Sequence, residues 1–131
     1  MWWEKYIGIP FVNRGRSAAG VDCGGLCMMV YRQELNKAIA EFDQHYIAWR
    51  IREAGQGIAY VRERSFTRVG APEPFAVAIF SRAGPYHVGI CIDRERLLHA
   101  KNHEHVKVQR LVEMTDYHNL EGFYVPATLE Q

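Results

Sequence analysis

The stretch Gly20-Val21-Asp22-Cys23-Gly24-Gly25-Leu26-Cys27-Met28-Met29-Val30 determines how the rest of the chain is interpreted. Asp22 is a good helix N-cap, and apolar residues follow Cys23 at spacings of three and four, so we predict a helix from Cys23 to about Asn36. Cys23 then lies in the first turn, where unpaired amides and the helix dipole favour an anion and lower the pKa of a thiol. Two glycines, which are poor helix formers, follow it directly, as expected where side chains would obstruct a substrate backbone. Taken alone, such a cysteine is more often a small buried hydrophobe. Other parts of the sequence are therefore needed to distinguish a packing thiol from a nucleophile.

Length and composition bound the architecture. A chain of 131 residues is long enough for a hydrophobic core, and we expect a single domain over residues 1–131. The 16 basic and 15 acidic residues are interspersed and give a net charge of +1, which offers no electrostatic basis for binding nucleic acid or an anionic membrane. The first residues lack the pattern of a signal peptide and no stretch is apolar enough for membrane insertion, so we expect a soluble chain made in the cytoplasm. Three cysteines without regular spacing indicate thiols rather than a disulfide framework.

Helical and irregular patterns fill the first half of the chain. Residues 1–19 are expected to be irregular and to wrap against the cysteine helix. A second helical pattern runs over residues 42–53, and a third short helix or irregular segment over residues 58–66. The Pro72-Glu73-Pro74 stretch favours extended chain and closes this half.

Strand patterns fill the second half. Residues 75–80 form a short continuous apolar run that suits a buried central strand, and residues 86–92 and 96–100 form a hairpin. Further short strands are predicted at 106–108 and 122–125. Helices followed by antiparallel strands predict an α+β fold.

The register of the predicted hairpin brings two histidines together. A loop formed by Asp93-Arg94-Glu95 buries the apolar partners of the two strands on one face by pairing Ile90 with Leu98 and Val88 with Ala100. The same register sets His99 opposite Gly89 and diagonal to His87, at a distance that long side chains can bridge. Gly89 then leaves room for the two rings to meet.

Two histidines on one face of a hairpin have three interpretations: a metal site, a satisfied pair in the core, or a base with its orienting partner. A thiol at a helix N-terminus, a histidine at a strand start and a second polar residue on the next strand are the parts of an activated nucleophile. We therefore interpret Cys23 as the attacking group, His87 as the base and His99 as the residue that orients the base. Cys27 and Cys91 are expected to be packing residues in the floor of the site.

Three blocks of the sequence resemble the catalytic blocks of the NlpC family of bacterial papain-like cell-wall cysteine peptidases: Gly20–Leu26, His87–Asp93 and Leu97–Ala100. The resemblance covers about residues 6–126, with the blocks in the family's order and with its twelve-residue step from His87 to His99. It implies a papain-like α+β fold in which N-terminal helices pack on a C-terminal antiparallel sheet.

The resemblance also implies a chemistry. Cys23 corresponds to the family's nucleophile, His87 to its general base and acid, and His99 to its third residue. A thiolate paired with protonated His87 would attack an amide and pass through a thioester, without a metal or a cofactor. Members typically cleave peptidoglycan stem peptides, most often between D-γ-glutamyl and diaminopimelate or a similar dibasic residue. Single-domain members with a Cys-Gly-Gly block look most like peptidases encoded with phage or prophage tail genes, which implies phage tail proteins as partners and action at the cell wall from a virion tail.

Further positions are expected to contact the substrate or the oxyanion, and these are Phe11, Asp22, Gly24 and Gly25. The family usually has a tyrosine at the position of Phe11, with its hydroxyl near the oxyanion site, and a serine at the position of Gly24. Pro74-Phe75 replaces a common Gly-Asp, and an insertion covers about residues 37–68, so specificity is the least transferable property.

Three other interpretations stay open. One is a tail-assembly or peptidoglycan-binding protein that keeps the fold without the activity, motivated by Phe11. Another is a metal site built from His99, His103 and His105, with Cys23 as a soft ligand. The third is an amidase or acyltransferase on the same scaffold.

Overall fold

The computed structural model describes residues 1–39, 66–80, 87–101, 104–114 and 119–128. The elements of these residues, in chain order, are η1 (Glu4–Tyr6), β1 (Arg16–Ser17), β2 (Gly20–Val21), α1 (Cys23–Leu35), β3 (Phe66–Val69), β4 (Val77–Phe80), β5 (His87–Cys91), β6 (Arg96–Ala100), β7 (Val106–Arg110), η2 (Leu111–Glu113) and β8 (Leu120–Pro126). Here η denotes a short 3-10 helix.

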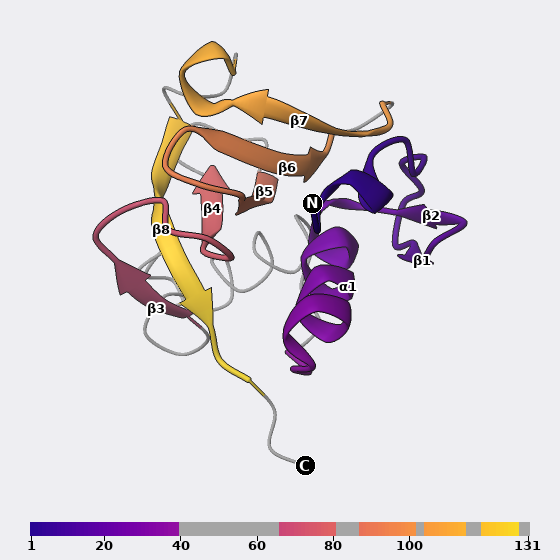
Figure 1. Cartoon of the computed structure of the whole chain (residues 1–131), viewed down its shortest axis with the longest axis horizontal. Coiled ribbons are helices and arrows are strands. Elements are labelled where there is room, and N and C mark those ends of the chain that lie inside the picture. Colours follow the sequence, from indigo (N-terminus) through magenta and orange to yellow (C-terminus); the bar gives the residue numbers. More distant parts are fainter. Residues whose placement is uncertain (40–65, 81–86, 102–103, 115–118, 129–131) are drawn as a thin grey trace, which may run out of the picture.

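A six-stranded sheet forms the centre of the described structure (Figure 1). Its strand order is β3-β8-β4-β5-β6-β7, and every neighbouring pair is antiparallel. The helix α1 packs against β5 and β6, and the small β1–β2 pair lies against α1. One α-helix on an antiparallel sheet, in the part of the chain that is described, confirms the predicted α+β fold.

The helix α1 begins and ends where the sequence predicts. The Asp22 side chain accepts a hydrogen bond from the Gly25 amide and caps the N-terminus, so Cys23 is the first helical residue. At the other end Asn36 adopts the left-handed conformation with φ of 51° and closes the helix. Local cap chemistry therefore fixes the position of the cysteine before any tertiary contact is considered.

The hairpin of β5 and β6 has the predicted register. Ile90 pairs with Leu98, and Cys91 pairs with Leu97. A Cβ atom on Gly89 would lie 2.8 Å from the Leu97 side chain and 3.0 Å from the Cβ of His99, so only glycine fits there. Gly89 thus makes room for the Leu97 side chain and for the Cβ of His99, whereas the sequence suggested that it makes room for the two histidine rings.

Each face of the sheet carries its own apolar cluster. The face covered by α1 contributes Val77, Ile79, Val88, Ile90, Leu98, Ala100, Val106 and Tyr124 to a core with the helix. The other face carries a smaller cluster formed by Ala76, Ala78, Phe80, Cys91, Leu97, Leu111 and Met114. Because side chains alternate along a strand, His87 and His99 belong to the face of this smaller cluster.

Some elements differ from the expectation, and others lie outside the described residues. Residues 16–21 form the β1–β2 pair within and beyond a segment expected to be irregular. Phe66, expected at the end of a helical or irregular segment, begins β3, which pairs with β8 at the edge of the sheet. An edge strand of four residues with two exposed side chains gives too short an apolar pattern to be recognised. The helix predicted over 42–53 lies outside the described residues.

Candidate active site

Cys23 lies at the start of α1 and is almost fully buried, with 1% of its surface exposed. Further along the helix, the Tyr31 hydroxyl donates to the carbonyl of Phe75, whose amide donates to the carbonyl of Cys91. Tyr31 is therefore held near the end of β5. Cys23 precedes Tyr31 by about 12 Å of helix, at roughly 1.5 Å per residue, and its side chain belongs to the core that α1 forms with the sheet.

Asp22 organises the chain around the cysteine. One carboxylate oxygen accepts hydrogen bonds from the Gly25 amide and the Arg16 guanidinium, both at 2.7 Å, and the other accepts the Arg14 amide at 3.0 Å. Asp22 is buried, and Arg16 supplies the opposite charge. This pairing limits the repulsion that the buried carboxylate would exert on negative charge at the neighbouring sulfur.

The two glycines after Cys23 are both buried. A Cβ atom on Gly25 would lie 2.2 Å from the Gly15 carbonyl oxygen and 2.9 Å from Nη1 of Arg16. Gly25 thus has a structural reason, the close approach of the loop at residues 15 and 16, that does not depend on a substrate. For Gly24, directly after the thiol, the role of leaving room for a substrate stays a prediction.

His87 and His99 contact each other directly. Nε2 of His87 lies 2.9 Å from Nδ1 of His99, and the two rings meet edge to face. Nε2 of His99 in turn lies 3.0 Å from Oε1 of Gln109 on β7. His99 is completely buried, and the His87 ring packs beside Phe80. The predicted pair is therefore part of a chain of three side chains across β5, β6 and β7.

Burial makes the histidine pair neutral. It lowers the pKa of His87 to about 3, and the positive charges of His99 and Lys101 act in the same direction. It also lowers the pKa of His99 to about 4, although the hydrogen bond of His99 to Oε1 of Gln109 raises this pKa. A neutral His87 at pH 7 is a ring that can accept a proton. The thiolate with protonated His87 expected from the sequence has to overcome this desolvation.

The other two thiols lie in the core. Cys27 and Cys91 are completely buried, and none of the three cysteines, all of which are described, is in a disulfide. Burial raises the pKa of Cys27 well above its usual value, and it raises the pKa of Cys91 to about 12. Both are therefore protonated packing residues at neutral pH.

Phe11 lies beside the cysteine segment. It forms an isolated bridge with Val21, two residues before Cys23, and packs half-buried against the main core. Its ring therefore lies near the start of α1 without a hydroxyl group to offer.

The proposed metal ligands are not gathered in the described residues. His105 is exposed and forms a bridge with Pro10, whereas His99 is buried against His87, and His103 lies outside the described residues. Within the described ranges no group of three His, Cys, Asp or Glu side chains is placed to hold a metal ion. The same ranges contain no helix with the length and apolar character of a membrane span.

Two residues of the site were not found from the sequence. Gln109 bonds to His99 because β6 and β7 pair with Leu97 opposite Gln109. Arg16 donates a hydrogen bond to Asp22 because the pairing of β1 with β2 brings the two residues together. The alternation of apolar and polar residues along β7 separates Gln109 from Val106 and Val108, which lie on the opposite face. The register of β7 with β6, however, depends on residues 101–105, whose loop type the sequence does not specify.

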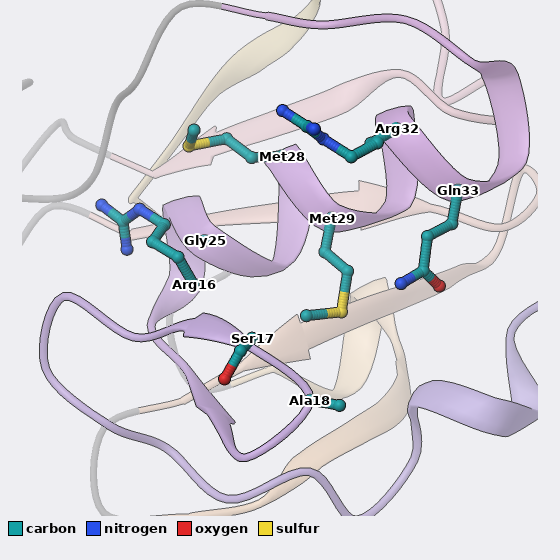
Figure 2. A pocket seen from close by; sticks show the side chains of 8 residues that line it. All are labelled: Arg16, Ser17, Ala18, Gly25, Met28, Met29, Arg32 and Gln33. Atoms are coloured by element: carbon teal, nitrogen blue, oxygen red, sulfur yellow. The ribbon is translucent and has the colours of Figure 1, made fainter.

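A cavity of about 320 Å³ opens on the side of α1 that faces away from the sheet (Figure 2). It is lined by Arg16, Ser17, Ala18, Gly25, Met28, Met29, Arg32 and Gln33. Figure 2 shows Arg16 beside Gly25 at the start of the helix and Arg32 two turns further on. Cys23, His87 and His99 are not among its lining residues, so this cavity is separate from the histidine pair.

Comparisons with known proteins agree with the fold. The model of the NlpC/P60 family matches residues 8–121. The NlpC/p60 domain of the peptidoglycan hydrolase SagA is similar in structure, with a TM-score of 0.61 and 24% identity over 95% of this chain and 92% of that one. An NlpC/P60 family protein from Bacillus cereus is similar with a TM-score of 0.67 and 17% identity, over 90% of this chain and 35% of that longer one. No curated protein matches the chain in sequence.

Proposed function

Since the chain belongs to the NlpC/P60 family, we propose that it is a cysteine peptidase that hydrolyses an amide bond in the stem peptides of peptidoglycan. The observation that carries this proposal is the buried contact between His87 on β5 and His99 on β6, the two strands against which the helix beginning at Cys23 packs. The similar domain of SagA belongs to a peptidoglycan hydrolase, which supports the same substrate class.

Each residue of the site has a role in the proposed reaction. His87 accepts the proton of Cys23, whose sulfur attacks the amide carbonyl, and amides at the start of α1 stabilise the oxyanion. His87 then donates this proton to the leaving amine, and a thioester to Cys23 remains. Water, activated by His87, hydrolyses the thioester and restores the thiol. His99 holds the His87 ring in position throughout.

The finer substrate assignment follows the family resemblance. We propose the bond between D-γ-glutamyl and diaminopimelate, or a similar dibasic residue, as the bond that is cleaved. We also propose that the protein acts at the cell wall as part of a phage or prophage tail. Neither assignment needs a metal or a cofactor.

Digestion of purified muropeptides tests the proposal. We expect the protein to release fragments whose masses identify one cleaved amide, and Cys23→Ala to release none. Cys27→Ala is the matched control, since Cys27 lies one turn further along the same helix. We expect this variant to keep its activity. Equal cleavage by the Cys23→Ala protein would contradict the proposal.

A second candidate function is a tail-assembly or peptidoglycan-binding protein of the same fold with little or no activity. The observation that favours it is Phe11, which offers no hydroxyl beside the start of α1. Sedimentation with intact peptidoglycan, together with unchanged muropeptides and slow alkylation of Cys23 at every pH, would support this function over hydrolysis.

A further inference from the structure

We propose that Gln109 is a positioning residue which, through His99, selects the tautomer of His87 that can act as a base. This inference rests on the proposed peptidase function but concerns a residue outside the three that the sequence indicated. The three side chains lie in line across neighbouring strands, with separations of 2.9 Å and 3.0 Å between the bonded atoms.

The direction of the hydrogen bonds follows from the chemistry of the amide. Oε1 of Gln109 can only accept, so Nε2 of His99 must carry a hydrogen. A neutral imidazole carries one hydrogen, which leaves Nδ1 of His99 as an acceptor. Nε2 of His87 must then donate to it, and Nδ1 of His87 keeps the lone pair. Gln109 thus makes Nδ1 the basic atom of His87.

Burial keeps His99 neutral, and this is why the acceptor of Gln109 can fix the tautomers of both rings. His99 is completely enclosed and its pKa is lowered, so a doubly protonated His99 ring, which would donate at both nitrogens, is disfavoured. With a neutral His99, the hydrogen on one ring nitrogen determines the role of the other. The reversed amide would donate to Nε2 of His99 and reverse both bonds, which would place the hydrogen of His87 on Nδ1. That tautomer could not accept a proton there.

The same chain also supports the protonated state of His87 during the reaction. When Nδ1 of His87 takes the proton, its Nε2 hydrogen still has the Nδ1 acceptor of His99. The charged groups that act on the pair are Lys101, Lys107 and Glu104, of which the two lysines oppose the added positive charge. A correctly oriented acceptor is therefore needed to offset burial and these lysines.

The ring nitrogens of both histidines can be read directly by ¹⁵N NMR of the labelled whole chain at pH 7. We expect the hydrogen on Nε2 in both His87 and His99. In Gln109→Met, which keeps the length of the side chain without the acceptor, we expect a mixture of tautomers. Gln109→Glu has only acceptor oxygens and should restore the single tautomer. Wild-type His87 with its hydrogen on Nδ1 would overturn the inference.

Kinetics supply the functional readout. We expect Gln109→Met to lower kcat by roughly tenfold with little change in KM, less than the ~10⁴-fold loss when a serine protease triad loses its orienting carboxylate. Gln109→Glu should recover most of kcat and shift the acid limb of the pH profile upward, since its negative charge favours a protonated ring. Arg110→Met is the matched control on the same strand and should leave kcat unchanged.

Different failures have different signatures. If the wild-type protein cleaves no muropeptide, the proposed function fails while the tautomer measurement still stands. If the wild type is active and Gln109→Met matches it in both kcat and tautomer, the role of Gln109 is wrong. A purely structural role would lower the melting temperature of Gln109→Met without altering the tautomers of its folded form, and that result also overturns the inference.

Discussion

The cysteine side and the histidine side of the site treat charge in opposite ways. At the start of α1 the helix dipole favours negative charge, and Arg16 offsets the carboxylate of Asp22. Across β5 and β6, burial and nearby positive charges disfavour a protonated ring at His87 and at His99. The helix terminus therefore favours negative charge on the cysteine side, against the burial of Cys23 itself, whereas the fold opposes an imidazolium on the histidine side.

This difference changes how the resting site is understood. A preformed ion pair needs both partners to be charged, and here burial disfavours the charged form of His87. We expect the neutral thiol and the neutral His87 to be the larger resting population, with the proton moving when a substrate carbonyl is attacked.

The largest effect is expected for His87→Ala, which removes the base from the histidine side. We expect kcat/KM on muropeptides to fall by about 10²–10⁴-fold, the range that a positioned acid-base group contributes. Alkylation of Cys23 near pH 7 should also slow. His105→Ala is the control, because His105 is exposed and forms its bridge with Pro10 rather than with a residue of the histidine pair. Undiminished activity in His87→Ala would assign the base to another group.

The second effect is acid destabilisation by the buried pair. The pKa values of His87 and His99 are lowered to about 3 and about 4, below the ordinary value of 6.5. The unfolded chain therefore binds protons below pH 6.5 that the folded chain does not, so stability is full above pH 6.5 and falls toward pH 4. Each histidine should contribute a slope of about 1.4 kcal/mol per pH unit.

Urea unfolding at a series of pH values measures this slope. In His99→Gln only one of the two buried histidines of the described residues remains, so the excess slope between pH 6.5 and 4 should fall to about half of its wild-type value. An identical pH dependence in the two proteins would show that His99 is not held neutral by the fold.

The cysteine side could be predicted from sequence because its information is local. Asp22 as the cap, Cys23 as the first helical residue and Asn36 at the end are all encoded within one short stretch. The hairpin register could also be predicted, because a wrong register would expose the apolar partners of Ile90 and Val88. Both features follow from short-range rules applied to few residues.

The remaining parts depend on contacts between distant segments. Gln109 reaches His99 only through the pairing of β6 with β7, and Arg16 reaches Asp22 only through the β1–β2 turn. Gly25 shows the same dependence, since its crowding comes from the loop at Gly15 rather than from its own helix. Local patterns therefore locate the reactive groups but not the residues that hold them.

The smallest effect is expected for Arg16→Met, which leaves the cysteine side with an uncompensated charge at Asp22. Because Asp22 is buried and Arg16 is only partly exposed, we expect a loss of about 2 kcal/mol in the free energy of unfolding, near the range for hydrogen bonds to charged groups. The rate of Cys23 alkylation should fall as well, since the unpaired carboxylate repels a thiolate.

Lys5→Met is the matched control for this change, because it breaks the more exposed pair of Lys5 with Glu34 at the other end of α1. Its cost should stay below about 1 kcal/mol, and Cys23 alkylation should not change. If Arg16→Met lowers stability without slowing alkylation, Arg16 secures the fold of the loop but not the charge at the sulfur. The preference of the cysteine side for negative charge would then come from the helix terminus alone, and the contrast with the histidine side would rest on one dipole rather than on a neutralised carboxylate.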